Sequence, residues 1–431
     1  MEKYFGTDGI RGPFGTAPID ELHLNRLAQA VGKRYTPQHL MIGRDTRASG
    51  VEIKRFLING FPSDTEIFDG GIVTSPLLSL AIIEAGAELG IMITASHNPA
   101  TDNGVKIFNR FGKKITVEEE EDLKQRMNDL PGPIENRGHH IIPYPIQAHY
   151  KMAPENPLPH VVIDCANGAA VEFAKASYHF PKIDWLGDQP DGRNINANCG
   201  SEHPELLCQT VRENGAHLGI AHDGDGDRLL LCDRFGKILP GEVVLGTIAI
   251  FLEKTGQLHG HQIVTTAMSN GGLRLSLEQY GIGVINAKVG DRHIAAMMHK
   301  FGSNLGGEHS GHIIFSDGTP SSDGIQAALL FLKAIEFLNL SPENTRPLIS
   351  FLPQKLCNIP VKRKFPLEDL PGWSALIEKE HEKIGKNGKI FVRYSGTEPK
   401  LRLLVEAETE DKVENVLNAL KNYIENREEI L

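Results

Sequence analysis

The sequence lacks the features that mark several large classes of protein. Its five cysteines form no CxxC pair, which argues against a zinc knuckle or a disulfide framework in a chain of 431 residues. Its longest apolar run, Val243 to Leu252, is far shorter than the roughly 18 residues that a membrane span needs. The first ten residues also lack the pattern of a signal peptide. We therefore expect a cytoplasmic protein that makes no membrane contact.

Nucleotide-binding and hydrolase motifs are missing as well. Neither the P-loop pattern GxxxxGK(S/T) nor the dinucleotide pattern GxGxxG occurs, which disfavours an ATP-dependent kinase or a dinucleotide dehydrogenase. The nucleophile elbow GxSxG is absent, so acyl-transfer hydrolysis has no support. Basic residues are outnumbered by acidic ones. The chain has 45 Lys and Arg residues against 55 Asp and Glu residues, which gives a net charge of −10. This balance disfavours nucleic acid and anionic membranes as partners but leaves small anions open.

The order of the apolar runs indicates several α/β domains. Short strand-like runs alternate with helical stretches from His39 to Thr94, which is typical of a parallel or mixed sheet flanked by helices. The Pro-rich stretch from Lys151 to His160 predicts a domain boundary near residue 150, and a further α/β segment opens at Gln262. Leu340 to Pro353 is expected to be a linker before a smaller unit, which ends in a helix from Asp411 to Asn426. At about 150 residues per domain, the length suggests about three domains.

The segment HDGDGDR, residues 222–228, is the strongest local signal. Its carboxylates Asp223, Asp225 and Asp227 are separated only by glycines, so the backbone can fold around one hard cation such as Mg²⁺ or Ca²⁺. An EF-hand loop would need Gly and Glu where Arg228 and Arg234 stand, so the calcium-sensor interpretation fails. Three like charges this close destabilise one another without a counter-ion, which favours a metal site over a solvated acidic turn.

A second candidate, TASHNP at residues 94–99, lies where an apolar strand ends, the usual place for reactive groups in open α/β sheets. Ser96 is the candidate nucleophile, and the neighbouring His97 suggests activation. A capping turn is the competing interpretation of a lone Ser–His pair. Lys106 lies close by in sequence and would be a proton donor or acceptor if it is buried, and ordinary surface charge if it is not.

Other loops carry groups suited to anions and hydroxyls. RYSGTEP, residues 393–399, is followed by Arg402, and its guanidinium and hydroxyl groups suit a phosphate better than a plain turn. GGEHSGH, residues 306–312, offers donors and acceptors for sugar hydroxyls, with a polar turn as an equal alternative. Two Arg-bearing loops near the start, residues 6–12 and 43–47, could supply more cations to the same cleft.

Taken together, these motifs resemble the α-D-phosphohexomutase superfamily, and within it the bacterial phosphoglucosamine mutases. The superfamily-level matches are, in order, TASHNP, DGDGDR, GGEHSGH and RYSGTEP. Four ordered motifs in one chain are very specific, and the resemblance covers the whole chain. FGTDGIRG near the start, PDGRNINANCGS at 190–201 and AKVGDRH at 287–293 are similar to the glucosamine branch.

The resemblance implies a four-domain, heart-shaped α/β architecture. Three related α/β domains with mixed sheets would carry the phosphoserine loop, the metal loop and the sugar-binding loop in that order. A smaller, mobile, TBP-like α+β domain at the C-terminus would bind phosphate. The expected domains are residues 1–152, 153–252, 253–356 and 357–431.

The resemblance also implies a reaction, the interconversion of glucosamine 6-phosphate and glucosamine 1-phosphate. A phosphorylated Ser96 would pass its phosphoryl group to the sugar, and the resulting glucosamine 1,6-bisphosphate would return the other phosphoryl group. The product would feed UDP-N-acetylglucosamine and cell-wall synthesis. One Mg²⁺ per chain would be held by the Ser96 phosphate with Asp223, Asp225 and Asp227.

The remaining site residues follow from the same resemblance. Lys106 would be the general acid and base. Arg11 and Arg228 would flank the phosphoserine, and His97 would shape its loop. The substrate-binding residues would be Glu308, Ser310, Arg292, Arg393, Ser395, Gly396, Thr397 and Arg402.

Two other functions stay open. His309 and His293 differ from the residues usual at these positions, which keeps open a phosphomannomutase/phosphoglucomutase on the same scaffold. A non-catalytic, metal-dependent sugar-phosphate binding protein is disfavoured because Ser96, Lys106 and the three Asp residues are intact. The expected partner is a small-molecule sugar phosphate, with no nucleic acid and no membrane, and a homodimer stays open.

Overall fold

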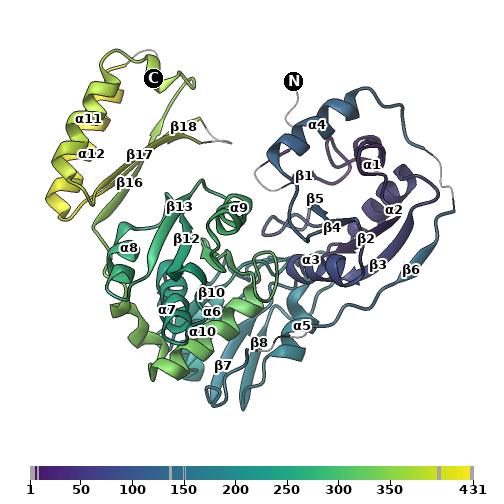
Figure 1. Ribbon diagram of the computed structural model, residues 1–431, viewed down its shortest axis with the longest axis horizontal. Helices are drawn as coiled ribbons and strands as arrows, with labels where there is room; N and C mark the ends of the chain where they lie inside the picture. The colour runs from purple at the N-terminus through teal and green to yellow at the C-terminus, as the bar shows by residue number, and fades with distance from the viewer. Residues whose placement is uncertain are drawn as a thin grey trace. The chain divides into compact units, whose positions relative to one another are not determined.

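The computed structural model describes residues 5–6, 9–134, 138–148, 150, 152–395 and 399–427 (Figure 1). The chain divides into two compact units. The larger unit comprises residues 1–268 and 282–346, and the smaller unit comprises residues 269–281 and 347–431. Each unit has its own sheets and its own apolar cores.

A mixed sheet built from the first third of the chain begins the larger unit. Its strands are β1 (Ile10–Pro13), β2 (His39–Arg44), β3 (Glu66–Ile72), β4 (Leu89–Ile93), β5 (Asp102–Asn109) and β6 (Ile141–Pro143). Its helices are α1 (Glu21–Tyr35), α2 (Gly50–Gly60), α3 (Ser75–Glu84) and α4 (Val117–Asn128). The strand order is β1-β5-β4-β2-β3-β6, and β5 runs antiparallel to β4 while β2, β3 and β4 are parallel.

Alternating side chains of β2 explain why helices pack on both faces of this sheet. Leu40 and Ile42 lie in one apolar core with residues of α1, α2 and α4, whereas Met41 lies in a second core with residues of α3. Successive side chains of a strand point to opposite faces, so one apolar run serves both cores. All five residues of β4 are buried, as expected of a central strand covered on both sides.

Two further mixed sheets complete the larger unit. The second has the order β11-β10-β9-β7-β8 and the third the order β13-β12-β14-β15. The second part contains β7 (His160–Asp164), α5 (Ala170–Ser177), β8 (Lys182–Leu186), α6 (Glu205–Asn214), β9 (Leu218–Ala221), β10 (Leu230–Asp233) and β11 (Ile238–Leu239). The third contains α7 (Gly241–Lys254), η1 (His259–His261), β12 (Gln262–Thr266), β13 (Gly283–Ala287), α9 (Asp291–Phe301), β14 (Leu305–Gly307), β15 (Ile313–Phe315), α10 (Gly324–Leu338) and η2 (Pro342–Leu348).

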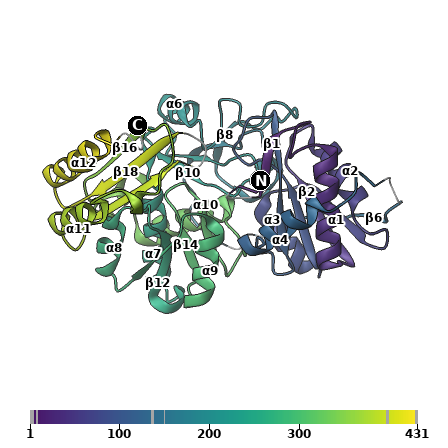
Figure 2. The ribbon, with the colours of Figure 1, turned by 90° about the horizontal axis from the view of Figure 1, so that it is seen from above.

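The smaller unit contains an antiparallel sheet against which two of its helices pack. Its elements are α8 (Gly271–Glu278), β16 (Gln354–Pro360), η3 (Leu367–Asp369), α11 (Trp373–Ile384), β17 (Lys389–Tyr394), β18 (Lys400–Glu406) and α12 (Glu410–Glu425). The strand order is β16-β18-β17, and α11 and α12 lie against the sheet (Figure 2). The helically spaced apolar residues of α12, from Val413 to Ile424, are buried in this core.

These units confirm the predicted fold class of mixed α/β sheets followed by a smaller domain with an antiparallel sheet. Two details differ from the sequence analysis. Residues 342–348 of the expected linker form η2. α8, which follows β12 in the chain, groups with the smaller unit, because Asn270 and Leu352 exchange two hydrogen bonds of 3.0 Å. Helical spacing reveals that a helix forms, but not which sheet it joins.

Within the described ranges, no single helix is long and apolar enough to cross a membrane, and the bent pair of α10 and η2 passes that test only when the two are taken together.

Close packing of α1 on α2 generates the first prediction. A Cβ atom on Gly60 would lie 2.5 Å from the Asn25 carbonyl oxygen and 2.6 Å from the Ala28 Cβ atom. We expect Gly60→Ala to lower the free energy of unfolding by about 1–3 kcal/mol, because the helices must move apart. Gly132→Ala is the matched control, since its Cβ meets no atom within 4 Å. Denaturant unfolding followed by circular dichroism measures both, and equal losses would contradict the close approach.

Candidate functional site

Ser96 lies just beyond the C-terminal end of β4. Its side chain is buried, and its backbone N–H donates to Thr94 Oγ1 at 2.8 Å. Thr94 in turn donates to Asp45 Oδ2 at 2.7 Å, at the end of the neighbouring strand β2. Ser96 has a φ of 52°, a left-handed conformation that is uncommon and costly for a residue with a Cβ atom. The loop therefore holds Ser96 in a conformation that surrounding contacts must stabilise.

The acidic loop after β9 approaches this serine directly. Ser96 Oγ donates to Asp223 Oδ2 at 2.7 Å, although the two residues are 127 positions apart. Gly224 allows the approach, because a Cβ atom there would lie 2.6 Å from the Ser96 carbonyl oxygen. Ligand atoms of Asp223, Asp225 and Asp227 all lie within 4.8 Å of one another, and all three side chains are buried. The predicted nucleophile and the predicted metal loop thus meet.

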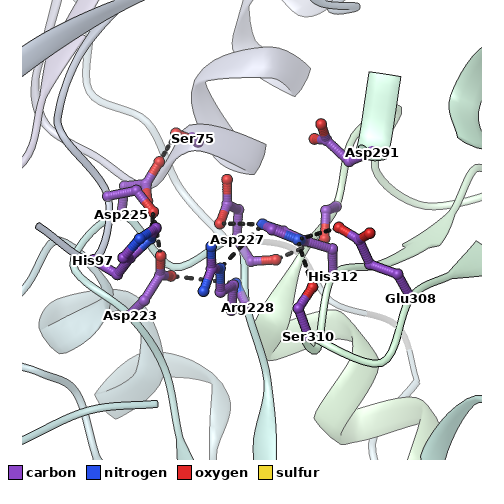
Figure 3. A network of polar contacts seen from close by, with 12 residues as sticks. Ser75, His97, Asp223, Asp225, Asp227, Arg228, Asp291, Glu308, Ser310 and His312 are labelled. Atoms are coloured by element: carbon purple, nitrogen blue, oxygen red, sulfur yellow. Dashed lines mark hydrogen bonds and ion pairs between the residues drawn. The ribbon is translucent and has the colours of Figure 1, made fainter. Parts of the chain in front are cut away.

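Buried positive charge and a hydroxyl surround the carboxylates. Lys106 Nζ, on β5, lies 2.7 Å from Asp225 Oδ2 and 2.8 Å from Asp227 Oδ2, and its side chain is only 1% exposed. Ser75, at the start of α3, donates to Asp225 Oδ2 (Figure 3). Of the two interpretations left open for Lys106, burial holds and ordinary surface charge does not.

The donor set fits a divalent cation such as Mg²⁺, which prefers carboxylate oxygens. Asp225 Oδ1 is buried and has no hydrogen-bond partner within the part of the chain that the structure describes. Burial, together with the charges of Asp227 and Asp225, raises the pKa of Asp223 to about 7. A cation bound here would neutralise the excess negative charge of the carboxylates, and Asp225 Oδ1 would serve as one of its ligands.

His312 links the acidic loop to the predicted sugar loop between β14 and β15. Its Nε2 lies 3.3 Å from Asp227 Oδ1, and its Nδ1 lies 2.9 Å from Glu308 Oε1 (Figure 3). Burial alone would lower the pKa of His312, but these carboxylates outweigh burial and raise it to about 10. Ser310 Oγ lies 3.3 Å from the same Nδ1. Glu308 and Ser310 therefore lie together near the acidic cluster, joined to it by a charged imidazolium.

His97 lies beside Ser96, and the charges of two arginines act on His97. His97 Nδ1 is 3.3 Å from Ser96 Oγ, and burial, followed by the charges of Arg228 and Arg11, lowers the pKa of His97 to about 4. His97 is therefore neutral at neutral pH. Arg228 also donates its backbone N–H to Asp223 Oδ1 at 3.3 Å, and its guanidinium pairs with Glu202. His97 thus contacts Ser96, and Arg228 and Arg11 lie near enough to His97 to lower its pKa. That both arginines flank a phosphoserine stays a prediction.

Arg292 has a different environment at the start of α9. Its guanidinium donates to Glu120 Oε2 of α4 at 2.8 Å, and both side chains are more than nine-tenths buried. The neighbouring Asp291 accepts from Lys114 Nζ at 2.7 Å. These ion pairs join the first and third α/β parts beside a cavity of about 430 Å³. Substrate binding by Arg292 stays a prediction.

The predicted phosphate loop lies in the smaller unit. Arg393 of β17 lies directly opposite Arg402 of β18, and like charges opposite each other destabilise a strand pair unless an anion separates them. Ser395 is buried, and its backbone N–H donates to the Lys400 carbonyl at 2.8 Å. Phosphate binding by Arg393, Ser395 and Arg402 stays a prediction. Gly396 and Thr397, also predicted to bind substrate, lie outside the described residues.

Arg47 corrects one part of the expectation that residues 43–47 supply cations to the cleft. Its side chain is fully buried, and its Nε donates to Asp45 Oδ2 at 2.9 Å, so its charge is neutralised inside the fold. Sequence reasoning also missed Ser75, which no local pattern connects to Asp225 150 positions away. His312 was part of a recognised motif, GGEHSGH, but its contacts with both carboxylates depend on the fold.

Comparisons with known proteins point to one family along the whole chain. Models of the phosphoglucomutase/phosphomannomutase domains match in order: α/β/α domain I at residues 2–131, domain II at 139–236, domain III at 240–349 and the C-terminal domain at 356–422. The phosphoglucosamine mutase of Streptococcus pneumoniae serotype 2 (strain D39) is 36% identical over 98% of this chain and 98% of its own length.

Solved structures show the same fold. A phosphoglucomutase/phosphomannomutase family protein from Burkholderia thailandensis superposes with a TM-score of 0.81 at 21% identity, covering 99% of this chain and 98% of that one. Aspergillus fumigatus N-acetylphosphoglucosamine mutase, solved with GlcNAc-6P and magnesium, superposes with a TM-score of 0.65 at 17% identity, covering 98% and 96%.

The acidic cluster generates a binding prediction. Metal-free wild-type protein should bind one Mn²⁺ per chain, and Asp225→Asn should weaken that binding by about 10-fold or more, because affinity follows the charge of the ligand set. Isothermal titration calorimetry measures both constants. Asp64→Asn, at an exposed position, is the matched control and should bind like wild type. Equal affinities of all three proteins would contradict a metal site at the cluster.

Proposed function

Because the chain belongs to the phosphoglucomutase/phosphomannomutase family, we propose that it is a hexosamine-phosphate mutase that interconverts glucosamine 6-phosphate and glucosamine 1-phosphate. The name of the Streptococcus relative supports the aminated sugar, and the ligand of the Aspergillus structure supports a sugar phosphate as the bound molecule. A cytoplasmic location, a homodimer and a role in UDP-N-acetylglucosamine synthesis stay predictions.

The contact of 2.7 Å between Ser96 Oγ and Asp223 Oδ2 is the observation that carries the proposal. It joins a hydroxyl at the C-terminal end of a central strand to a buried carboxylate cluster. A hydroxyl acceptor beside a divalent-cation site suits phosphoryl transfer, in which positioning and charge neutralisation dominate. The same contact argues against a protein that only binds sugar phosphates, because such a protein has no use for a buried hydroxyl at the ion site.

In the proposed reaction Ser96 carries a phosphoryl group in the resting enzyme. The bond between phosphorus and Ser96 Oγ breaks while O1 of glucosamine 6-phosphate bonds to phosphorus. The O1 proton passes to Lys106 and a proton returns to Ser96 Oγ, so no net proton is gained. After glucosamine 1,6-bisphosphate reorients, its O6 phosphoryl group returns to Ser96 by the reverse sequence, and glucosamine 1-phosphate leaves.

The other predicted residues have supporting roles in this proposal. Asp223, Asp225 and Asp227 would hold Mg²⁺ together with the Ser96 phosphate, and the ion would neutralise charge on the transferred oxygens. Arg11 and Arg228 would bind the transferred phosphoryl group. The sugar hydroxyls and the other phosphate would be bound by Glu308, Ser310, Arg393, Ser395 and Arg402.

A substrate comparison tests the aminated sugar. We expect kcat/KM for glucosamine 6-phosphate to exceed that for mannose 1-phosphate and glucose 1-phosphate by at least about 10-fold, because a site built for an amino group leaves polar groups unpaired with other sugars. Coupled assays under identical Mg²⁺ concentrations give the three values. A clear preference for either unaminated sugar would instead favour a phosphomannomutase/phosphoglucomutase.

Substitution of the nucleophile tests the phosphoenzyme. Ser96→Ala should lower mutase activity at least about 1,000-fold, because the hydroxyl that accepts the phosphoryl group is removed. Intact-mass spectrometry should detect one added phosphoryl group on wild type after incubation with glucose 1,6-bisphosphate, and none on Ser96→Ala. Ser63→Ala, at an exposed position, is the control and should behave like wild type. Phosphorylation of the Ser96→Ala protein would place the nucleophile elsewhere.

A further inference from the structure

The loop that carries Ser96 is held by a buried arginine from its own domain. Arg47 follows β2, and its guanidinium nitrogens donate to the carbonyl oxygens of Ser96 at 2.9 Å, Asn98 at 2.8 Å and Asp102 at 2.9 Å, and also to that of Pro99. A guanidinium has five N–H groups in a fixed fork, so one side chain can satisfy several carbonyls at once. Arg47 therefore sets the path of the backbone from residue 96 to residue 102.

Asn196 holds the same loop from the second α/β part. Its Nδ2 donates to the Ser96 carbonyl at 2.8 Å and to the Asn98 carbonyl at 3.0 Å. The backbone N–H of Asn196 donates to the Ala166 carbonyl at 2.8 Å, which fixes its own position. Its side chain is buried, and its φ is 59°. Two carbonyls of the loop are thus each bound by Arg47 on one side and by Asn196 on the other.

The hydrogen bonds from Arg47 and Asn196 act on the backbone conformation of Ser96, which the proposed reaction needs. Ser96 adopts a left-handed backbone conformation that is unfavourable for a serine, and only surrounding contacts can maintain it. That conformation directs Oγ toward Asp223, which lies in the same α/β part as Asn196. Displacement of a reacting group by about 1 Å can reduce a transfer rate about 100-fold.

We propose that Asn196 and Arg47 are positioning residues, which hold the carbonyls of the Ser96 loop so that Ser96 Oγ is aligned for phosphoryl transfer. The inference rests on the proposed function. Neither residue touches the transferred group: each acts through the backbone of the loop. Asn196 couples the position of the nucleophile to the part of the fold that carries the acidic cluster.

Asn196→Gly tests this directly, because glycine accepts the left-handed φ and removes the side-chain amide together with its Cβ atom. After rapid mixing with glucose 1,6-bisphosphate, the rate of phosphoryl uptake by Ser96, followed by quenched intact-mass measurement, should fall about 10- to 100-fold. With glucosamine 6-phosphate, kcat should fall by a similar factor while KM changes less than about 2-fold, because the sugar-binding side chains are untouched.

Two further variants separate positioning from folding. Asn196→Asp keeps the size of the side chain but replaces the donor with a charged acceptor, so uptake should fall at least as much as in Asn196→Gly. Arg47→Lys keeps a charge beside Asp45 with fewer donors and should also lower kcat with little change in KM. Asn198→Gly is the matched control, since Asn198 lies in the same loop with a φ of 54° and is exposed, and it should stay within about 2-fold of wild type.

The outcomes are distinguishable. Normal uptake by Asn196→Gly and Asn196→Asp, with an active wild type, would overturn the positioning role and leave the proposed function intact. A rise in KM and a lower melting temperature in proportion to the loss of kcat would assign a general structural role and also overturn it. A wild type that neither takes up a phosphoryl group nor interconverts sugar phosphates would remove the proposed function, and the inference with it.

Discussion

The burial of three carboxylates against Ser96 is the constraint on which the rest of the larger unit depends. Charges that are taken out of water and placed within 4.8 Å of one another are stable only with positive charge beside them. The carboxylates and their two cationic partners come from three different sheets. The acidic loop follows β9, Lys106 lies on β5, and His312 lies in the segment before β15. The electrostatics of one cluster therefore join the three α/β parts of the larger unit.

The same constraint explains why the loop that carries Ser96 is held by so many hydrogen bonds. Ser96 Oγ contacts a carboxylate from another α/β part, so the hydrogen bonds of β4 alone do not fix its position. Thr94 and Asp45 bind the loop from within the first sheet, and Gly224 lets the acidic loop come close to the Ser96 carbonyl. Backbone conformation, hydrogen bonding and close packing thus converge on one oxygen atom, as phosphoryl transfer requires.

Much of this architecture could be predicted from the sequence. The alternation of apolar runs predicted the elements from β2 to β4, and the alternating Asp–Gly spacing predicted the acidic cluster, because both depend on neighbouring residues. The family followed from four ordered motifs. The roles of Arg47 and Asn196 could not be predicted, since Asn196 is 100 positions from Ser96 and an arginine after a strand looks the same whether it faces a cleft or a core. The grouping of α8 with the smaller unit could not be predicted either, because periodicity does not record tertiary partners.

The central claim is that Ser96 and the acidic cluster form one centre. Phosphorus-31 NMR of wild-type protein phosphorylated with glucose 1,6-bisphosphate tests it most directly, with Mn²⁺ as a paramagnetic probe and Mg²⁺ as the diamagnetic control. One equivalent of Mn²⁺ should broaden the phosphoserine signal beyond detection, whereas Mg²⁺ should leave it sharp. A phosphoserine signal that stays sharp with one Mn²⁺ bound per chain would separate the nucleophile from the metal site and contradict the account.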